Sequence, residues 1–252
     1  YKVFGKNERQ VIERLKAGES REELASLGTA AVIDVSFEVA KGETFVVMGL
    51  SGSGKSTLIR MINGLWSPSE GTVEVAGKVV SDMNDAQLRA LRRDHVSMVF
   101  QHFALLPHLT VRENAAYGLK LQGKLKQKER LEKANEWLNT VGLNGWGDKY
   151  PHQLSGGMQQ RVGLARALAA ETDILLMDEA SSALDPLIRR EMQDQLLELQ
   201  GALNKTIIFI THDLNEAMYL GDHIAVMRNG RVAQIGTSDE ILTQPADDYV
   251  AD

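Results

Sequence analysis

The stretch GLSGSGKST has the residue types and the spacing needed to hold a phosphate group. Its three glycines let backbone N–H groups turn inward around an anion, while Lys55 can reach terminal phosphates and the Ser56 hydroxyl can ligate Mg²⁺. A purely structural turn would not require lysine and serine at those two positions. The sequence therefore predicts a nucleotide-binding loop made of Gly49, Leu50, Ser51, Gly52, Ser53, Gly54, Lys55, Ser56 and Thr57.

Two adjacent acids follow a run of apolar residues in ILLMDEA. Such a run is typical of a buried strand, and α/β sheets place their sites at the carboxyl ends of these strands. Because successive residues leaving a strand point in different directions, Asp178 can hold Mg²⁺ while Glu179 polarises a water that attacks the γ-phosphate. Acids often end strands without any function, so the catalytic interpretation depends on the phosphate loop elsewhere in the chain.

Two further polar residues follow predicted strands. His212 comes after TIIFIT, and we expect it to contact the γ-phosphate because neighbouring parallel strands bring their carboxyl ends together; the alternative is a structural histidine at a strand end. Gln101 ends the strand in VSMVF and starts a helical stretch, which predicts an amide at the hinge between the nucleotide and that stretch. Its alternative interpretation is a surface glutamine.

A second glycine-rich turn, LSGGMQQ, opens what the pattern predicts to be a helix. Ser155, Gly156 and Gly157 with the helix N-terminus supply N–H donors and the positive end of a dipole, which suits an anion. No lysine follows these glycines, so this second cradle is incomplete. Further along, Asp185 in SALDP stands directly before Pro186, where it could cap a helix.

The elements that position these residues follow from hydrophobic patterning. VIDVSFEV predicts a half-buried strand, TFVVMG, VSMVF, DILLMD and TIIFIT predict buried strands, and GTVEVAGKVV and HIAVMRNGRVAQIG predict hairpins. Before them, residues 7–18 predict an amphipathic helix, and residues 20–23 a capping box that opens a second short helix. Strands alternating with helices indicate an α/β fold: a mainly parallel sheet, an antiparallel β subdomain and an inserted α-helical subdomain.

Composition narrows the choice of partners. The 252 residues carry a formal net charge of −6 and no cysteine, which excludes disulfides and cysteine-ligated metals. The acidic balance argues against a nucleic-acid partner, since such proteins usually present a basic face. We interpret the richest basic run, residues 120–133, as a solvated helix face. The apolar runs are strand-sized, so we expect neither a membrane span nor an export signal.

In their order, the motifs resemble those of the nucleotide-binding subunit of an ABC transporter, a P-loop NTPase with a RecA-like core. The resemblance identifies Walker A in GLSGSGKS, the Q-loop at Gln101, the signature in LSGGMQQ, Walker B in ILLMD with Glu179, the D-loop in SALD and the switch histidine at His212. It implies that two copies close head to tail around ATP and Mg²⁺. The signature loop of one copy, including Gln159, would clamp the γ-phosphate held by the other, and Asp185 would contact the partner. The incomplete cradle is then half of a site.

The resemblance also assigns roles and boundaries. It implies catalysis by Glu179, His212, Lys55 and Gln101, coordination of Mg²⁺ by Ser56, Gln101 and Asp178, and nucleotide contacts from the Walker A loop, Gln101, Ser155, Gly156, Gly157, Gln159, Asp185 and His212. It implies a helical extension at 1–28 and one ABC ATPase domain at 29–252. Within that domain, 29–100 and 166–252 would form the core and β subdomain, and 101–165 the helical subdomain.

A less specific resemblance indicates the ATPases of glycine betaine, proline and choline importers. It lies in YKVFGK, in the helical stretch before VIDVSFEV and in MGLSGSGKSTLIRMINGL. This resemblance implies that the chain drives osmoprotectant uptake with ATP. It implies permease subunits as partners and, indirectly, a substrate-binding protein. It also implies a peripheral position at the cytoplasmic face of the inner membrane. Phe103, Leu105, Leu106 and Leu109 could form a groove for a permease helix or pack the subdomain core. The alternatives are a soluble ABC ATPase of DNA repair or translation, an importer ATPase for another solute, and a non-hydrolysing nucleotide sensor.

Two features depart from the family pattern. Many ABC cassettes stack adenine on an aromatic residue upstream of Walker A, but residues 24–33 contain no ring. Leu27 or Val32 could supply an apolar pad instead. Relatives in this subfamily often continue into paired CBS domains, which we do not expect in this chain.

Overall fold

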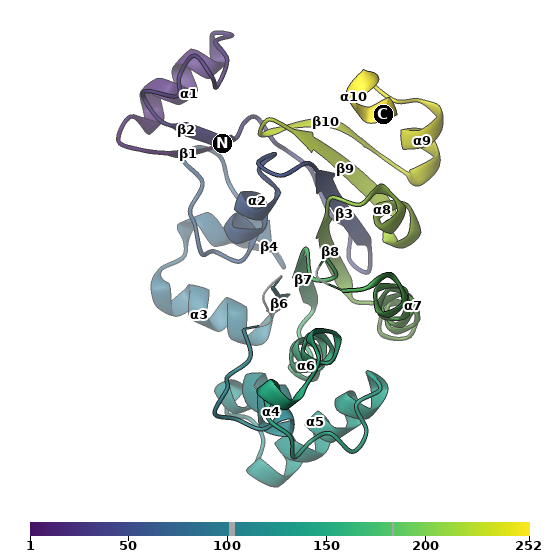
Figure 1. Cartoon of the computed structure of the whole chain (residues 1–252). Coiled ribbons are helices and arrows are strands. Elements are labelled where there is room, and N and C mark those ends of the chain that lie inside the picture. The colour runs from purple at the N-terminus through teal and green to yellow at the C-terminus, as the bar shows by residue number, and fades with distance from the viewer. Residues whose placement is uncertain (101–103, 183) are drawn as a thin grey trace. The chain divides into compact units, whose positions relative to one another are not determined.

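The computed structural model describes residues 1–100, 104–182 and 184–252, and it divides into two compact units. The first unit holds residues 1–39, 45–88 and 210–252, and the second holds residues 40–44 and 89–209. Figure 1 labels the elements in chain order. Within the described residues, every helix is too short or too polar to cross a bilayer.

The strands of the first unit carry the predicted buried run and the predicted last hairpin. β3 (Thr44–Gly49) pairs in parallel with β9 (His223–Arg228), which pairs antiparallel with β10 (Arg231–Gly236). All but one residue of β3 are buried, which explains why TFVVMG shows no polar alternation. The turn between β9 and β10 has Asn229 at φ 52° and Gly230 at φ 83°, the left-handed pair that a two-residue hairpin turn requires.

The unit contains further helices and two short strands. They are α2 (Lys55–Ile62), β4 (Glu74–Val75), β5 (Lys78–Val79), the 3₁₀ helix η1 (Val80–Asp82), α8 (Leu214–Leu220), α9 (Ser238–Thr243) and α10 (Asp248–Ala251). β4 and β5 form the hairpin predicted from GTVEVAGKVV. α3 (Asp85–Asp94) and β8 (Thr206–Thr211) each contain residues of both units.

The N-terminal extension has a small core of its own. β1 (Lys2–Phe4) pairs antiparallel with β2 (Thr29–Val32), and α1 (Glu8–Lys16) lies between them in the chain. The buried cluster is entirely apolar and consists of Val3, Val11, Ile12, Leu15, Leu24, Ala30 and Ile33. The predicted amphipathic helix is confirmed, with its apolar residues in this cluster.

The predicted second helix of the extension is wrong. Ser20 and Glu23 do exchange the two hydrogen bonds of a capping box, at 2.9 and 3.2 Å. Residues 21–27 nevertheless continue as turns, closed by bonds such as that from the Leu27 N–H to the Leu24 carbonyl. Leu24 is fully buried in the cluster, so tertiary packing sets the path of this segment before a regular helix can propagate.

The predicted strand VIDVSFEV is also wrong in its position. β2 ends at Val32, and residues 33–40 belong to no strand. The cause lies at Asp34, whose φ of 51° is left-handed and interrupts an extended backbone. Residues 35–40 still alternate between half-buried and exposed. The alternation of apolar and polar residues therefore predicted correctly that one side of this segment is buried. It did not predict correctly that the segment pairs with another strand.

The second unit combines strands with a helical bundle. β6 (Val96–Val99) pairs in parallel with β7 (Ile174–Asp178), as predicted for two buried runs. Between them in the chain, the helices α4, α5 and α6 pack against one another, as Figure 1 shows. The helices of this unit are α4 (Val111–Gln122), α5 (Gln127–Thr140), the 3₁₀ helix η2 (Pro151–Gln153), α6 (Gly156–Ala169) and α7 (Pro186–Leu203).

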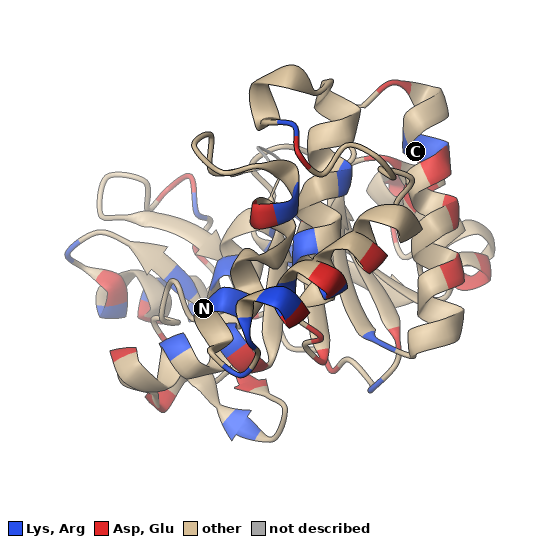
Figure 2. Cartoon of the chain, turned by 90° about the horizontal axis from the view of Figure 1, so that it is seen from below, with Lys and Arg blue, Asp and Glu red and all other residues tan. Residues whose placement is uncertain are grey.

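Charged residues of both signs are spread over the helices and loops (Figure 2). In the basic run at residues 120–133, Lys120, Lys124, Lys126 and Lys128 are exposed to solvent. Lys133 pairs with Glu171 at 2.6 Å. The run is thus a solvated face on α4, α5 and the loop between them, as predicted.

Candidate functional site

The predicted phosphate loop connects β3 to α2, the strand–loop–helix order that its motif requires. Gly54 precedes the helix at φ 101° and Gly52 has φ 79°, both in the left-handed region. A Cβ atom at Gly49 would collide with the Met227 carbonyl oxygen, and one at Gly54 with the Ala31 carbonyl oxygen. The loop therefore fits between β9 and β2 only because these two positions lack side chains.

Two side chains of the loop lie inside it. Lys55 is 5% exposed, and its Nζ donates hydrogen bonds to the Gly49 carbonyl and, at 3.3 Å, to the Leu50 carbonyl. Ser53 is 4% exposed, and its Oγ has no hydrogen-bond partner among the described residues. Ser56 is exposed at the start of α2. The loop thus holds a lysine, a serine hydroxyl and an open helix N-terminus, which is a set of groups suited to phosphate and Mg²⁺.

The two acids leave β7 in the second unit. Asp178 is the last residue of the strand and is 6% exposed, whereas Glu179 is half-buried at φ 48°. The left-handed backbone at Glu179 turns the chain sharply, and the Ser182 hydroxyl and N–H donate to the Glu179 carbonyl at 2.9 and 3.2 Å. A non-glycine residue in this conformation costs of order 1 kcal/mol and is common at functional sites.

The second glycine-rich turn opens α6, as predicted. Ser155 is the N-cap residue, and its Oγ accepts a hydrogen bond from the Met158 N–H at 3.3 Å. Ser155 and Gly156 are exposed, and a Cβ at Gly156 would meet no atom within 4 Å. Gly157 is buried against Ile188 of α7, and Gln159 Nε2 donates to the Pro151 carbonyl at 3.0 Å. The first turn of α6 therefore presents an open, uncharged helix N-terminus.

Two other predicted residues lie at helix starts. The Asp185 Oδ1 accepts hydrogen bonds from the N–H groups of Leu187 and Ile188, both at 3.1 Å, so the capping interpretation is confirmed. His212 is exposed directly after β8 in the first unit. Its neighbour Asp213 caps α8 by accepting from Asn215 at 2.8 Å and Glu216 at 3.2 Å.

The predicted site residues fall into two groups. The phosphate loop and His212 belong to the first unit, whereas Asp178, Glu179, the glycine-rich turn before α6 and Asp185 belong to the second. Gln101 and Phe103 lie outside the described residues, as does Ala183 of the SALD stretch.

The sequence prediction missed an aromatic residue, Phe4, whose strand lies beside the β2 strand that touches the phosphate loop. Phe4 lies opposite Thr29 in the β1–β2 pair, two residues from Ala31, whose carbonyl abuts Gly54. Phe4 is 36% exposed. Of the two residues predicted as an apolar pad, Val32 is 1% exposed, while Leu27 is half-buried and packs against the core cluster of the extension. The pad prediction considered only residues near the loop in sequence, whereas strand pairing places Phe4, which precedes α1 in the chain, beside β2.

Comparisons with known proteins agree on one family. The ABC transporter family model matches residues 32–182. The glycine betaine transport ATP-binding protein OpuAA of Bacillus subtilis (strain 168) is 55% identical over 251 residues, 99% of this chain and 60% of OpuAA. The glycine betaine/proline betaine transport system ATP-binding protein ProV of Escherichia coli (strain K12) is 53% identical over 255 residues, 99% of this chain and 63% of ProV. The chain thus spans less than two thirds of the length of these relatives.

The fold has close counterparts among solved structures. A dimeric structure of a post-hydrolysis state of the ATP-binding cassette MJ0796, bound to ADP and Pi, is 36% identical and has a TM-score of 0.77. The match covers 82% of this chain and 90% of that chain. This likeness confirms the predicted fold class, an ABC ATPase cassette with a mostly parallel central sheet, antiparallel strands and helices.

Proposed function

Because this chain belongs to the ABC transporter family, we propose that it is the ATP-hydrolysing subunit of an importer for an osmoprotectant such as glycine betaine, proline or choline. The names of OpuAA and ProV, which state glycine betaine and glycine betaine/proline betaine transport, support this class of solute. The observation that carries the mechanism is the pair of glycine-rich turns. One contains a lysine, while the other presents an open helix start without one.

ATP is the proposed substrate of the phosphate loop, and its fit follows from the groups present. Gly49 and Gly54 let the loop pack closely against β9 and β2, a Cβ at Gly52 would meet no atom within 4 Å, and Lys55 lies within the same loop. Backbone N–H groups of such a loop can bind phosphates. Ser56, Asp178 and Gln101 would hold Mg²⁺. The described residues contain no cluster of three acidic or histidine side chains that could cage a metal. Mg²⁺ in such sites usually keeps several waters and phosphate oxygens, and it would neutralise charge on the phosphates when bound.

Hydrolysis would use residues at the ends of two strands. Glu179 would orient the attacking water and accept its proton, since the sharp turn after β7 separates its direction from that of Asp178. Lys55 would stabilise the negative charge that develops on the γ-phosphate, and His212 would fix the same phosphate by a hydrogen bond. Lys55 and His212 would thus act on the charge and position of the γ-phosphate and Glu179 on the attacking water, and none of the three would form a covalent bond to the substrate.

A second copy of the chain would complete each site. Ser155, Gly156 and Gly157, with Gln159 beside them, would offer N–H donors and the positive end of the α6 dipole to the γ-phosphate held by the partner. The exposure of Ser155 and Gly156 supports this proposal, because an approaching anion meets no side chain there. Asp185 is exposed at the start of α7 and would contact the partner.

Coupling to permease subunits would run through Gln101 into residues 101–165, the proposed helical subdomain. Leu105, Leu106 and Leu109 are half-buried, so part of their apolar surface remains available to a permease helix. This arrangement would place the chain peripherally at the cytoplasmic face of the inner membrane, with a substrate-binding protein as an indirect partner. We retain the proposed division into an extension at 1–28, a core with its β subdomain at 29–100 and 166–252, and the helical insert.

Phe4 is the proposed platform for adenine. It lies on the strand that pairs with β2, and β2 touches the phosphate loop through Ala31 and Gly54. An aromatic ring offers a π-face on which a base can stack. This assignment replaces the apolar pad predicted from Leu27 and Val32.

The rival functions lack a specific supporting observation. A soluble ABC ATPase of DNA repair or translation would be distinguished by failure to co-purify with a polytopic membrane protein. A nucleotide sensor without hydrolysis would leave Glu179 and His212 without a role. An importer ATPase for another solute would share every site described above, because the solute itself would be bound by other subunits.

The decisive experiment measures mass in solution. Glu179→Gln keeps the size of the side chain but removes the proton acceptor, so the ATP-bound state should persist. Light scattering with and without Mg-ATP should then show a nucleotide-dependent dimer. The double variant Glu179→Gln/Ser155→Arg should lose this dimer while still binding ATP, because the new side chain fills the open helix start. A chain that binds ATP and stays monomeric with its permease subunits present would contradict the proposal.

A further inference from the structure

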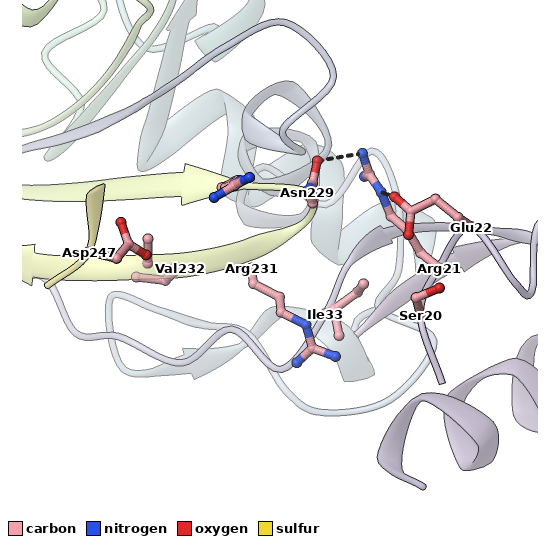
Figure 3. A pocket seen from close by; sticks show the side chains of 10 residues that line it. Ser20, Arg21, Glu22, Ile33, Asn229, Arg231, Val232 and Asp247 are labelled. Carbon is pink, nitrogen blue, oxygen red and sulfur yellow. Dashed lines mark hydrogen bonds and ion pairs between the residues drawn. The ribbon is translucent and has the colours of Figure 1, made fainter. Parts of the chain in front are cut away.

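One side chain of the N-terminal extension, Arg21, contacts the phosphate loop. Its guanidinium donates to Asn229 Oδ1 at 3.1 Å and to the Gly52 carbonyl oxygen at 3.5 Å, the long limit of a hydrogen bond. Its Nε lies 3.4 Å from a carboxylate oxygen of Glu22. Figure 3 shows the guanidinium directed toward the Asn229 side chain, with Glu22 beside it. We propose that Arg21 is a positioning residue that holds the phosphate loop in its nucleotide-binding shape.

The β9–β10 turn already holds the next carbonyl of the loop. The Gly230 N–H donates to the Ser53 carbonyl at 2.9 Å, and the Gly230 carbonyl accepts from the Ile33 N–H at 2.7 Å. Arg21 bonds to Asn229 of this same turn. The extension, the turn and the phosphate loop are therefore joined at one point by contacts that the phosphate-loop motif does not predict.

These contacts determine which way the backbone N–H groups of the loop point. In a trans peptide, the carbonyl and the N–H of one peptide group point in opposite directions. Holding the carbonyls of Gly52 and Ser53 outward therefore directs the N–H groups of Ser53 and Gly54 toward the inside of the loop. The Ser53 N–H donates to the Leu50 carbonyl at 3.1 Å, which closes a turn within the loop, so the Gly54 N–H is the group that this arrangement directs toward a phosphate. Inward N–H groups are what a phosphate needs.

Arg21 can act as a fixed support because its own segment is anchored. Ser20 and Glu23 hold each other by two hydrogen bonds, and Leu24 is fully buried in the extension core. The Arg21 side chain is 27% exposed. It lines a cavity of about 360 Å³, which leaves space on one side of the guanidinium (Figure 3). The contact is thus set by directed hydrogen bonds rather than by packing, and a single substitution can remove it without disturbing a core.

This inference rests on the proposed nucleotide binding and predicts an effect on affinity rather than turnover. Arg21→Ala should weaken the binding of Mg-ADP about three- to tenfold, the range expected for losing one or two exposed charge-assisted hydrogen bonds. The kcat at saturating Mg-ATP should stay within about twofold of wild type, because Arg21 contacts no reacting group. Arg21→Lys should give an intermediate affinity, since it keeps the charge but not the two-pronged geometry.

The experiment is isothermal calorimetry with Mg-ADP, paired with steady-state ATPase rates. Arg14→Ala is the matched control, because Arg14 belongs to the same extension but pairs with Glu19 at 2.6 Å. Asn229→Gly removes the other partner while tolerating the left-handed backbone, and Arg21→Ala should have a smaller effect in that background. If wild type, Arg21→Ala and Arg14→Ala bind Mg-ADP with equal affinity, the inference about Arg21 is overturned but the proposed function is not. A wild-type chain that binds no Mg-ADP would overturn the proposed function and this inference together.

Discussion

Phe4 and Trp66 pack edge to face, with ring centroids 5.1 Å apart and an interplanar angle of 79°. Both residues remain partly exposed, at 36% and 38%, and the Arg60 guanidinium lies 5.5 Å from the centre of the Trp66 ring. Edge-to-face contact restrains both rings without covering their faces completely. Trp66 therefore lies where its fluorescence can report on a base that stacks against Phe4.

Replacing Phe4 with alanine should weaken Mg-ATP binding by about tenfold, because stacking of a base on an aromatic ring contributes roughly 1–3 kcal/mol. Phe4→Tyr should bind within about twofold of wild type, since it keeps the ring. Calorimetry measures the affinities, and tryptophan fluorescence follows the same titration with Trp66→Phe as the control for the origin of the signal. Unchanged affinity in Phe4→Ala would remove this ring from the adenine site.

Gly54→Ala tests the contact between the phosphate loop and β2. The new Cβ would collide with the Ala31 carbonyl and would force a side chain onto a backbone at φ 101°. Gly71→Ala is the matched control, because its φ is 99° and its Cβ would meet no atom within 4 Å. We expect backbone strain to lower the free energy of unfolding of both variants by about 1 kcal/mol. The collision in Gly54→Ala should lower it further by about 1–3 kcal/mol and should abolish most of the nucleotide affinity. Urea unfolding and calorimetry measure the two effects; equal losses in both variants would show that the contact is unimportant.

Gln160 offers a test of packing inside the helical bundle. It is fully buried in α6, and among the described residues neither end of its amide has a hydrogen-bond partner. Burying an unpaired amide costs roughly 1–3 kcal/mol, so Gln160→Met should raise the free energy of unfolding by about 1 kcal/mol. Gln159→Met is the control and should not stabilise, since Gln159 Nε2 donates to the Pro151 carbonyl at 3.0 Å. A less stable Gln160→Met variant would indicate that the buried amide is satisfied in solution.

Local patterns were predicted well wherever neighbouring residues decide the conformation. The two-residue turn at Asn229 and Gly230, the helix start at Ser155 and the cap at Asp185 each depend on the backbone preferences of a few consecutive residues. The predictions of a helix opened by residues 20–23 and of a strand in VIDVSFEV were wrong, although the local pattern was genuine in both cases. Burial of Leu24 in the first case and the left-handed Asp34 in the second took precedence over it.

The sequence by itself determined the chemistry of this protein: a lysine and a serine after a glycine loop, two acids after a buried strand, and a second glycine-rich turn without a lysine. Each of these signals lies within a short stretch, because the backbone groups and side chains that form one loop or one strand end are neighbours in the chain. Only the tertiary structure decided what surrounds the loop. Arg21 and Asn229 are 208 residues apart in the chain, and Phe4 reaches β2 only through strand pairing across α1. Such contacts depend on how distant segments fold onto one another, and no local pattern encodes that arrangement.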